Sequence, residues 1–297
     1  MSGRLVVTGA GGQVGSLVTA RAQRAGREAL ASTSSEWDIT DPDAAASHIE
    51  SGDVVINCAA YTNVDGAESD EAGAYAVNAN GPEILARTCA AAGARLIHIS
   101  TDYVFNGDFG DARPRPYEPG DPTGPQSVYA RSKLAGEQAV FGAFPEAVVV
   151  RTAWVYTGGL DRSDFVAVMQ RLAGGDGVIK VVDDQVGSPT YADDVAVALL
   201  ELADSDVRGR LLHAANEGVV SRFEQARAVF EESGADPHRV QPCTSEEFPR
   251  PAVRPPYSAL SGLEWAAAGL TPLRPWRDAL VAALTAASNR PLPSMRD

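Results

Sequence analysis

Short apolar runs alternate with longer alanine-rich stretches along the first half of the chain. Five of these runs are apolar at nearly every position, which is typical of strands in a parallel sheet that is covered on both faces. The expected strands are residues 4–8, 28–32, 53–57, 95–100 and 147–152. The expected helices are residues 13–25, 42–51, 71–92 and 129–142. This β-α-β-α alternation predicts an α/β fold with a doubly wound parallel sheet and right-handed crossovers.

The second half of the chain is less regular and is rich in proline at residues 249–256. This change predicts a second, smaller C-terminal lobe. A helical pattern at 192–204 and a strand-like run at 210–215 are expected to return to the first domain. The first domain is therefore expected over residues 1–155 with 192–215, and the C-terminal lobe over residues 156–191 and 216–290.

A glycine- and proline-rich loop runs from Phe105 to Gln126 and leads directly into the expected helix at 129–142. Connections of this length are uncommon in compact domains and are usually functional or mobile.

The composition limits the classes of partner. The chain has 297 residues and a formal net charge of −14, which argues against nucleic acid or an anionic membrane surface, because both need clustered Lys and Arg. No apolar run reaches the ~18 residues that cross a bilayer, and a strand expected directly at the N-terminus leaves no room for a signal peptide. We therefore expect a cytoplasmic protein with neither a nucleic-acid nor a membrane partner.

The cysteines and histidines give no sign of a metal site. Cys58, Cys89 and Cys243 have no CxxC spacing, which predicts reduced, buried thiols. The four histidines are scattered along the chain and match no metal-ligand spacing. We expect no bound metal.

The first chemical motif is "VTGAGGQVG" at residues 7–15, where three glycines follow a strand and open a helix. In this context Gly9 allows the tight turn, Gly12 lets the backbone approach a pyrophosphate, and Gly15 packs the helix against the strand. The helix N-terminus supplies free N–H groups for the phosphates. The motif predicts a Rossmann-type dinucleotide-binding domain, with a bare structural turn as the alternative.

The type of dinucleotide depends on the end of the second strand. In NAD-specific folds an acidic residue at that point holds the ribose 2′-OH, whereas here the strand ends in "STSS" (32–35), followed by Glu36 and Asp38. The hydroxyls suit a 2′-phosphate, although no arginine stands among them. We expect NADPH, or the use of both NADPH and NADH. Asp38 is a cofactor contact or a cap of the helix after Pro42.

Two further motifs follow the third and fourth strands. In "NCAAYTNVDGAE" (57–68), the small Ala59 and Ala60 would let a flat dinucleotide lie against the backbone, with core packing as the alternative. In "ISTDYVF" (99–105), Thr101 is expected at the carboxyl edge of the sheet, where open α/β sheets bind ligands.

The pair Tyr129 and Lys133 completes a candidate catalytic set. In "VYARSKLAGEQ" they are four residues apart, so on a helix they share one face. Reducing a ketone by hydride transfer creates an alkoxide that must be protonated, and Tyr129 can donate that proton. Lys133 is expected to hold the cofactor and to lower the pKa of Tyr129, while Thr101 orients the substrate oxygen.

The remaining candidates have weaker signals. Trp154 follows the fifth strand at the same edge, so it stacks on a sugar or base, or belongs to the core. Arg250 and Arg254 are candidate clamps for a substrate diphosphate, or solvated surface residues. The segment "DDQVGSPTYADD" (183–194) lines the site or caps the helix at 192–204.

These residues resemble the extended short-chain dehydrogenase/reductase superfamily. Five segments resemble, more narrowly, the dTDP-4-dehydrorhamnose reductases, and they are "NCAAYTNVDGAE", "STDYVF", "VYARSKLAGEQ", "RTAWVY" and "DDQVGSPT". The resemblance extends over residues 4–275. It implies NADPH-dependent reduction of the C4 ketone of a dTDP-4-dehydro-sugar, dTDP-4-dehydrorhamnose, to dTDP-L-rhamnose.

The resemblance also implies roles for single residues. Tyr129 would be the proton donor, Lys133 would bind the nicotinamide ribose, and Thr101 would tune the tyrosine. The implied cofactor contacts are Gly12, Gln13, Val14, Asp38, Ile39, Ala60, Tyr61 and Thr62. The implied substrate contacts are Thr101, Asp102 and Trp154. Asn78 resembles the superfamily's active-site asparagine, or is a polar residue of a helix.

One departure and two alternatives bear on these expectations. Some members of the family dimerise through a magnesium ion held partly by a glutamate at the position of Leu17, which cannot bind a hard cation. We therefore expect a monomer or a weak homodimer. A related dehydratase is disfavoured because Tyr103, and not a second carboxylate, follows Asp102, and a related epimerase is a further alternative. A non-catalytic regulatory subunit is disfavoured by the complete set of Thr101, Tyr129 and Lys133.

Overall fold

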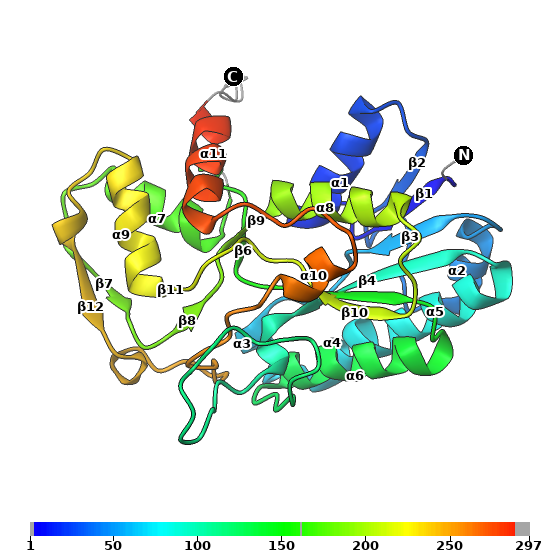
Figure 1. Ribbon diagram of the computed structural model, residues 1–297, viewed down its shortest axis with the longest axis horizontal. Coiled ribbons are helices and arrows are strands. Elements are labelled where there is room, and N and C mark those ends of the chain that lie inside the picture. The colour runs from blue at the N-terminus through cyan, green and yellow to red at the C-terminus, as the bar shows by residue number, and fades with distance from the viewer. Residues whose placement is uncertain (1–2, 161, 289–297) are drawn as a thin grey trace.

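The computed structural model describes residues 3–160 and 162–288, and it contains a parallel sheet of six strands in the order β10-β5-β4-β3-β1-β2 (Figure 1). The predicted doubly wound α/β fold is confirmed, and every neighbouring pair in this sheet is parallel. The strands are β1 Leu5–Thr8, β2 Ala29–Ser32, β3 Val54–Asn57, β4 Arg95–Thr101, β5 Val148–Thr152 and β10 Arg210–His213.

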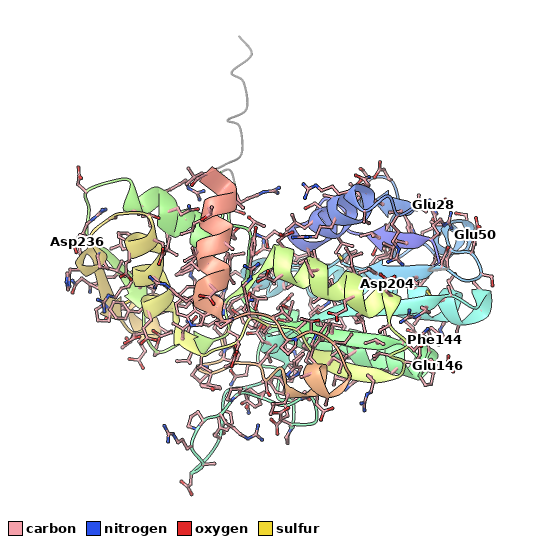
Figure 2. All side chains as sticks on the ribbon, turned by 45° about the horizontal axis from the view of Figure 1, so that its top comes forward. Glu28, Glu50, Phe144, Glu146, Asp204 and Asp236 are labelled. Atoms are coloured by element: carbon pink, nitrogen blue, oxygen red, sulfur yellow. The ribbon has the colours of Figure 1, made fainter. Side chains whose placement is uncertain are left out.

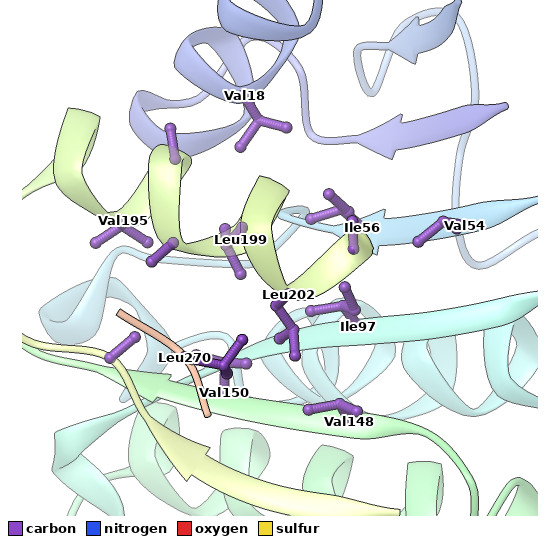
Figure 3. Packing of buried hydrophobic residues seen from close by; sticks show 14 of the residues in the cluster. Val18, Val54, Ile56, Ile97, Val148, Val150, Val195, Leu199, Leu202 and Leu270 are labelled. Carbon is purple, nitrogen blue, oxygen red and sulfur yellow. The ribbon is translucent and has the colours of Figure 1, made fainter. Parts of the chain in front are cut away.

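Helices cover both faces of the sheet. One face carries α1 (Gln13–Arg24) and α8 (Ala192–Asp204), and the other carries α2 (Pro42–His48), α5 (Gly81–Ala92) and α6 (Val128–Ala143). Along β1, Leu5 and Val7 join the core under α1 and α8, whereas Val6 joins the opposite core. Figure 3 shows the first of these cores, with side chains of α8 packed on β3, β4 and β5. Burial on both faces explains why the strand sequences are apolar at nearly every position.

The helix expected over residues 71–92 is interrupted by a π-helical turn. It consists of α4 (Glu71–Tyr75), the π-helix η1 (Ala76–Asn80) and α5. Helix α6 passes close to this turn, because a Cβ on Gly136 would lie 2.0 Å from the carbonyl oxygen of Asn78. The interruption thus depends on a tertiary contact, and π-bulges of this kind often occur at functional sites.

The second lobe has its own core, formed by residues of α7 (Phe165–Ala173), α9 (Arg222–Glu232), α11 (Trp276–Ser288) and short strands. These strands form three separate pairs, β8–β11, β7–β12 and β6–β9. Their bounds are β6 Val155–Tyr156, β7 Ile179–Val182, β8 Val186–Gly187, β9 Thr190–Tyr191, β11 Val220–Ser221 and β12 Val240–Cys243. The predicted limits between the lobes stay a prediction, although β10 does pair with β5 in the main sheet.

The remaining short elements connect the two lobes or lie at their edges. They are α3 Val64–Ala67, α10 Leu263–Ala267 and the 3-10 turns η2 Asp102–Val104, η3 Pro237–Arg239 and η4 Ser245–Glu247. The long loop after Phe105 is anchored by Tyr117, whose ring stacks on Phe105 at 3.9 Å between centroids and whose N–H donates to the carbonyl of Ala259 at 2.8 Å.

Several acidic residues lie at the two far ends of the molecule. Figure 2 shows Glu28, Glu50, Glu146 and Asp204 together at one end, and Asp236 at the tip of the second lobe. The first three precede β2, β3 and β5, so they mark the amino edge of the sheet. None of the described helices is long and apolar enough to cross a membrane.

Candidate active site

The glycine loop leaves the N-terminus of α1 uncovered. Gly9 has φ +66°, and a Cβ there would lie 2.6 Å from the amide nitrogen of Ala59. A Cβ on Gly15 would lie 2.4 Å from the carbonyl oxygen of Gly9. Gly9 and Gly15 are therefore required by close packing within the chain itself. A Cβ on Gly12 would be less crowded, at 3.3 Å from the carbonyl oxygen of Gly9. Gly12 is the N-cap of α1 and offers no side-chain cap, so the first N–H groups of the helix are available to an anion.

Gln13, the first residue of α1, reaches toward the second lobe. Its side-chain amide donates to Asp164 at 3.3 Å, and the same carboxylate oxygen accepts from the hydroxyl of Thr157 at 2.8 Å. The other Asp164 oxygen accepts from the N–H of Ala167 and caps α7. The glycine loop is thereby connected to the second lobe.

A carboxylate does stand at the end of β2, although the sequence suggested only hydroxyls there. Glu36 folds back and accepts from the N–H and the hydroxyl of Thr33, both at 2.8 Å. These hydrogen bonds lower the pKa of Glu36. The sequence alone did not predict this position of Glu36, because it depends on a turn that brings the residue back to the end of β2.

Asp38 does not cap α2. Its carboxylate accepts from the N–H and the hydroxyl of Thr40, at 2.9 and 2.8 Å, and these bonds lower its pKa. The cap of α2 is Asp41, which accepts from the N–H of Asp43 at 2.9 Å. The side chain of Ile39 is buried in the core under α2 and α5, so any cofactor contact by Ile39 would use its backbone.

Two buried asparagines fix the segment after β3, which contains Ala59, Ala60, Tyr61 and Thr62. Asn57 accepts from the N–H of Ala59 at 3.0 Å. Asn78, in the π-helical turn, accepts from the N–H of Tyr61 at 2.8 Å and donates to the carbonyl of Tyr61 at 3.1 Å. Its amide also donates to Ser132 on α6 at 3.0 Å. Asn78 is fully buried, so it holds the predicted cofactor segment in place through the backbone.

Thr101, Tyr129 and Lys133 lie together at the carboxyl edge of β4. Thr101 ends β4, and Tyr129 lies in the first turn of α6, whose N-cap is Ser127. A hydrogen-bonding interaction with Thr101 acts on the phenol of Tyr129. Lys133 is 2% exposed and donates from Nζ to the carbonyl of Ile99 on β4 at 2.7 Å. The structure thus brings the predicted catalytic residues into one place.

The electrostatics of this group differ from the expectation. Burial raises the pKa of Tyr129, the Thr101 interaction lowers it, and the charges of Asp102 and Tyr103 raise it. The predicted lowering of the Tyr129 pKa by Lys133 is not seen in the protein alone, because the Lys133 ammonium is directed at the Ile99 carbonyl. Burial lowers the pKa of Lys133 itself to about 8.

Asp102 is almost completely buried, and both of its carboxylate oxygens have partners. Oδ1 accepts from the Thr101 hydroxyl at 3.2 Å, and Oδ2 accepts from the Ser258 hydroxyl at 2.5 Å. Burial raises the pKa of Asp102 to about 6, and the Ser258 hydrogen bond and the charge of Arg222 oppose this shift. A substrate contact by Asp102 stays a prediction.

Sequence reasoning missed Arg222, the first residue of α9. Its guanidinium lies 3.5 Å from the centroid of the Trp154 ring and 4.8 Å from that of Phe165. Trp154 has φ 46°, and a Cβ on Gly187 would lie 2.5 Å from its indole. Arg222 and Gly187 therefore both lie against the indole. The capping box of Ser221 and Glu224 was the available signal for a helix starting at Arg222.

Arg254 lies on the proline-rich segment and is bound to the first domain. It donates to both carboxylate oxygens of Asp65, at 2.5 and 2.9 Å. Burial raises the pKa of Tyr103, and the charges of Arg222 and Arg254 oppose this shift. Arg250 is 3.7 Å from Asp65 and its side chain is 67% exposed. The positive charges of two guanidinium groups thus act on Tyr103, the residue after Asp102.

Comparison with known proteins assigns the family. Residues 3–289 match the family model described as RmlD substrate binding domain. A protein of Mycobacterium tuberculosis named dTDP-4-dehydrorhamnose reductase is 71% identical, covering 100% of this chain and 99% of the relative. The chain belongs to the dTDP-4-dehydrorhamnose reductase family.

Solved structures named as dTDP-4-dehydrorhamnose reductases have the same fold. A crystal structure from Clostridium acetobutylicum has a TM-score of 0.89 and 36% identity, and covers 96% of this chain and 99% of that one. One from Bacillus anthracis, in complex with NADP, has a TM-score of 0.87 and 33% identity, and covers 96% of this chain and 100% of that one. The resemblance inferred from the five motifs is confirmed.

The family's magnesium position was the one predicted departure. Leu17 packs against the core under α1 and α8 as a half-buried residue. Within residues 3–160 and 162–288, no cluster of three or more His, Cys, Asp or Glu side chains is arranged to hold a metal ion. The expected monomer or weak homodimer stays a prediction for this member of the dTDP-4-dehydrorhamnose reductase family.

Proposed function

We propose that this chain is an NADPH-dependent reductase that converts the C4 ketone of dTDP-4-dehydrorhamnose into the hydroxyl of dTDP-L-rhamnose. The observation that supports this most strongly is the group formed by Thr101, Tyr129 and Lys133 at the carboxyl edge of β4. The charge of Lys133 acts on Cys58, the residue before Ala59. This effect indicates that the group lies close to the segment that follows β3. Family membership and the NADP complex of the Bacillus anthracis relative support the same reaction.

The chain's own residues fit a dinucleotide. The uncapped start of α1 offers N–H groups of Gln13, Val14 and Gly15 to the pyrophosphate, and the small Gly12 leaves room for it. The backbone at Asp38 and Ile39 would lie toward the adenosine, and Ala59, Ala60, Tyr61 and Thr62 would line the other side. When bound, the cofactor supplies the hydride. Lys133 would hold the nicotinamide ribose.

Tyr129 would donate the proton that the developing alkoxide needs. Its raised pKa keeps the phenol protonated at neutral pH, so the proton is available when the hydride arrives. Lys133, with a pKa of about 8, is largely protonated at neutral pH and supplies positive charge next to the cofactor segment. Thr101 would orient the substrate oxygen together with Tyr129.

The substrate carries a diphosphate, which Arg222 and Arg254 would bind. The charges of both arginines act on Tyr103, the residue after Asp102. Arginine suits bidentate contacts with phosphate oxygens. Arg254 forms an ion pair with Asp65. We expect the diphosphate either to bind Arg254 alongside Asp65 or to replace Asp65 as its partner. Trp154 supports Arg222 by cation–π stacking and contacts the sugar.

The direct test is the oxidation of NADPH by the purified protein after addition of dTDP-4-dehydrorhamnose. We expect the nicotinamide absorbance to fall in proportion to the keto sugar added, and dTDP-L-rhamnose to accumulate. A matched control is Lys180→Met, because Lys180 is the other lysine of the chain and pairs with Glu247 on the surface. Lys133→Met should lose NADPH binding, whereas Lys180→Met should keep it. Equal behaviour of the two variants would contradict the site.

A further inference from the structure

A buried ion pair joins α6 to β5 one helical turn beyond Lys133. Arg151 on β5 donates from Nε to Oε1 of Glu137 at 2.8 Å and from Nη2 to Oε2 at 2.6 Å. Glu137 follows Lys133 by four residues, so their side chains lie on the same face of the helix. Arg151 is 2% exposed and Glu137 is 3% exposed. Because one guanidinium binds both carboxylate oxygens, the pair holds the helix and the strand in one relative position.

The same face of α6 is bonded to two consecutive residues of β4. Lys133 donates to the carbonyl of Ile99 at 2.7 Å, and Glu137 accepts from the hydroxyl of Ser100 at 2.5 Å. The next residue, Thr101, ends β4. These two bonds therefore fix the position of α6 along the strand that carries Thr101.

Arg151 extends this contact to the long loop that leads into α6. It stands opposite Ser100 in the register of β4 and β5. Its Nη1 donates to the carbonyl of Pro119 at 3.3 Å, and its guanidinium lies 5.0 Å from the centroid of the Phe105 ring. Phe105 begins the loop and Pro119 lies within it. A single guanidinium thus contacts the loop and, through Glu137, the helix that follows the loop.

Stability alone does not explain why two charges are buried at this place. Moving charges out of water is costly, and apolar side chains of similar volume in place of a buried ion pair are often neutral or stabilising. The best-attested role of buried polar groups is to select one register of packed elements. Apolar contacts are non-directional, whereas a bidentate ion pair adds geometric specificity.

We propose that Glu137 and Arg151 are a positioning pair, which holds α6 on β4 so that the proposed catalytic group stays together at the end of the strand. That group consists of Thr101, Tyr129 and Lys133. The inference rests on the proposed reductase function, because the group that it positions is the one assigned to that reaction. The pair acts through the helix and takes no part in the transfer of the hydride or the proton.

The test replaces the pair by apolar side chains in the double variant Glu137→Leu with Arg151→Met. Neither change leaves an unpaired buried charge, so we expect the fold to persist. Because misplacing reacting groups by about 1 Å costs about 10²-fold in rate, we expect kcat to fall by a factor of about 10–100 well below the unfolding temperature. A lower melting temperature with a wild-type kcat would show that the pair only stabilises the fold, and would overturn the proposal.

A second ion pair with the same bidentate geometry provides the matched control. Arg4 donates from Nε and Nη2 to the two carboxylate oxygens of Asp53, at 3.1 and 2.8 Å. These residues precede β1 and β3, so they lie at the amino edge of the sheet, opposite to the edge with Thr101. Arg4→Met with Asp53→Leu should therefore keep the wild-type kcat. Equal losses of kcat in the two double variants would also overturn the proposal.

Ser100→Ala decides the question even if the first double variant does not fold. It removes the bond between β4 and Glu137 without changing any charge. The chain has two lysines, Lys133 and Lys180, so labelling with [13Cε]-lysine gives two side-chain resonances, which Lys180→Met assigns. In Ser100→Ala we expect the Lys133 resonance to shift and kcat to fall, while the Lys180 resonance stays in place. An unchanged kcat or an unmoved Lys133 resonance would overturn the proposal.

The reductase function and the positioning role can fail independently. A wild-type protein that leaves NADPH unoxidised in the presence of the keto sugar would refute the reductase function. The Lys133 resonance is measured without cofactor or substrate, so in that case it still tests whether the contacts of Glu137 hold α6 in position.

Discussion

The phenol of Tyr129 lies in surroundings that raise its pKa, although its proposed task is to give up a proton. The two facts agree for a reductase. An acid with a high pKa stays protonated at neutral pH, and an alkoxide that develops at the substrate is a stronger base than the phenolate. Lys133, which sequence reasoning expected to act on Tyr129, is instead bound to the Ile99 carbonyl. Its charge would act on Tyr129 through the bound cofactor.

Replacing Tyr129 by Phe tests the proton donor. We expect kcat to fall by a factor of about 10²–10⁴, the usual contribution of a positioned acid, because only the hydroxyl is removed. NADPH affinity, measured by fluorescence titration, should stay close to that of the wild type. A variant that keeps more than about a tenth of the wild-type kcat would speak against this role.

Trp154 tests the substrate side of the site. In Trp154→Ala we expect the KM for the dTDP-sugar to rise by a factor that corresponds to about 1–2 kcal/mol, because Arg222 loses its stacking partner and the sugar loses a contact. Trp154→Phe keeps a flat ring and should lose less. The KM for NADPH should change little in both variants. A lower melting temperature with equal losses on both substrates would show that Trp154 is a core residue.

At the scale of elements, the sequence pattern predicted the parts of the fold that depend on local order. The strands and most helices follow from buried apolar runs between alanine-rich stretches. The π-helical turn at Ala76–Asn80 was not predictable, because it depends on the close approach of Gly136 from α6. The capping box of Ser221 and Glu224 marks a helix that starts at Arg222, but it does not indicate what Arg222 contacts. The position of Arg222 against Trp154 follows from the pairing of the two-residue strands β8 and β11, which carry no periodic signal.

The loop between β1 and α1 allows a paired test of binding against folding. Gly12→Val should abolish NADPH binding and lower the melting temperature less than Gly15→Ala does, because the nearest atom to a Cβ is 3.3 Å away at Gly12 and 2.4 Å away at Gly15. Gly15→Ala should lower the melting temperature, because its Cβ would lie 2.4 Å from the Gly9 carbonyl oxygen. Fluorescence titration and thermal unfolding separate the two effects. Unchanged NADPH affinity in Gly12→Val would refute the role of the glycine loop.

At the scale of the whole molecule, the site forms where the two lobes meet. The first domain contributes the glycine loop, Thr101 and Tyr129, and the second contributes Arg222. Three of the contacts that join these parts are those of Gln13 with Asp164, Asp65 with Arg254 and Asp102 with Ser258. In each contact one residue, namely Gln13, Arg254 or Asp102, is predicted to bind the cofactor or the substrate. Composition and periodicity predicted a second lobe but carried no information on these pairings, which join residues more than a hundred positions apart.

The oligomeric state is expected to be independent of magnesium. Leu17 cannot bind a hard cation, and the described residues contain no metal-binding cluster. Sedimentation velocity in the presence of EDTA should therefore give the same species as with Mg²⁺, and activity should be unchanged. A species that dissociates on chelation and reforms with Mg²⁺ would contradict this.

The central claim is that this chain transfers a hydride from NADPH to C4 of a dTDP-4-dehydro-sugar. Its most direct test uses NADPH in which both hydrogens at C4 of the nicotinamide are deuterium, with dTDP-4-dehydrorhamnose as substrate. The account predicts dTDP-L-rhamnose with deuterium at C4 of the sugar, and no transfer with Tyr129→Phe beyond a small residual. Unconsumed NADPH, or a product without deuterium at C4, would contradict the account.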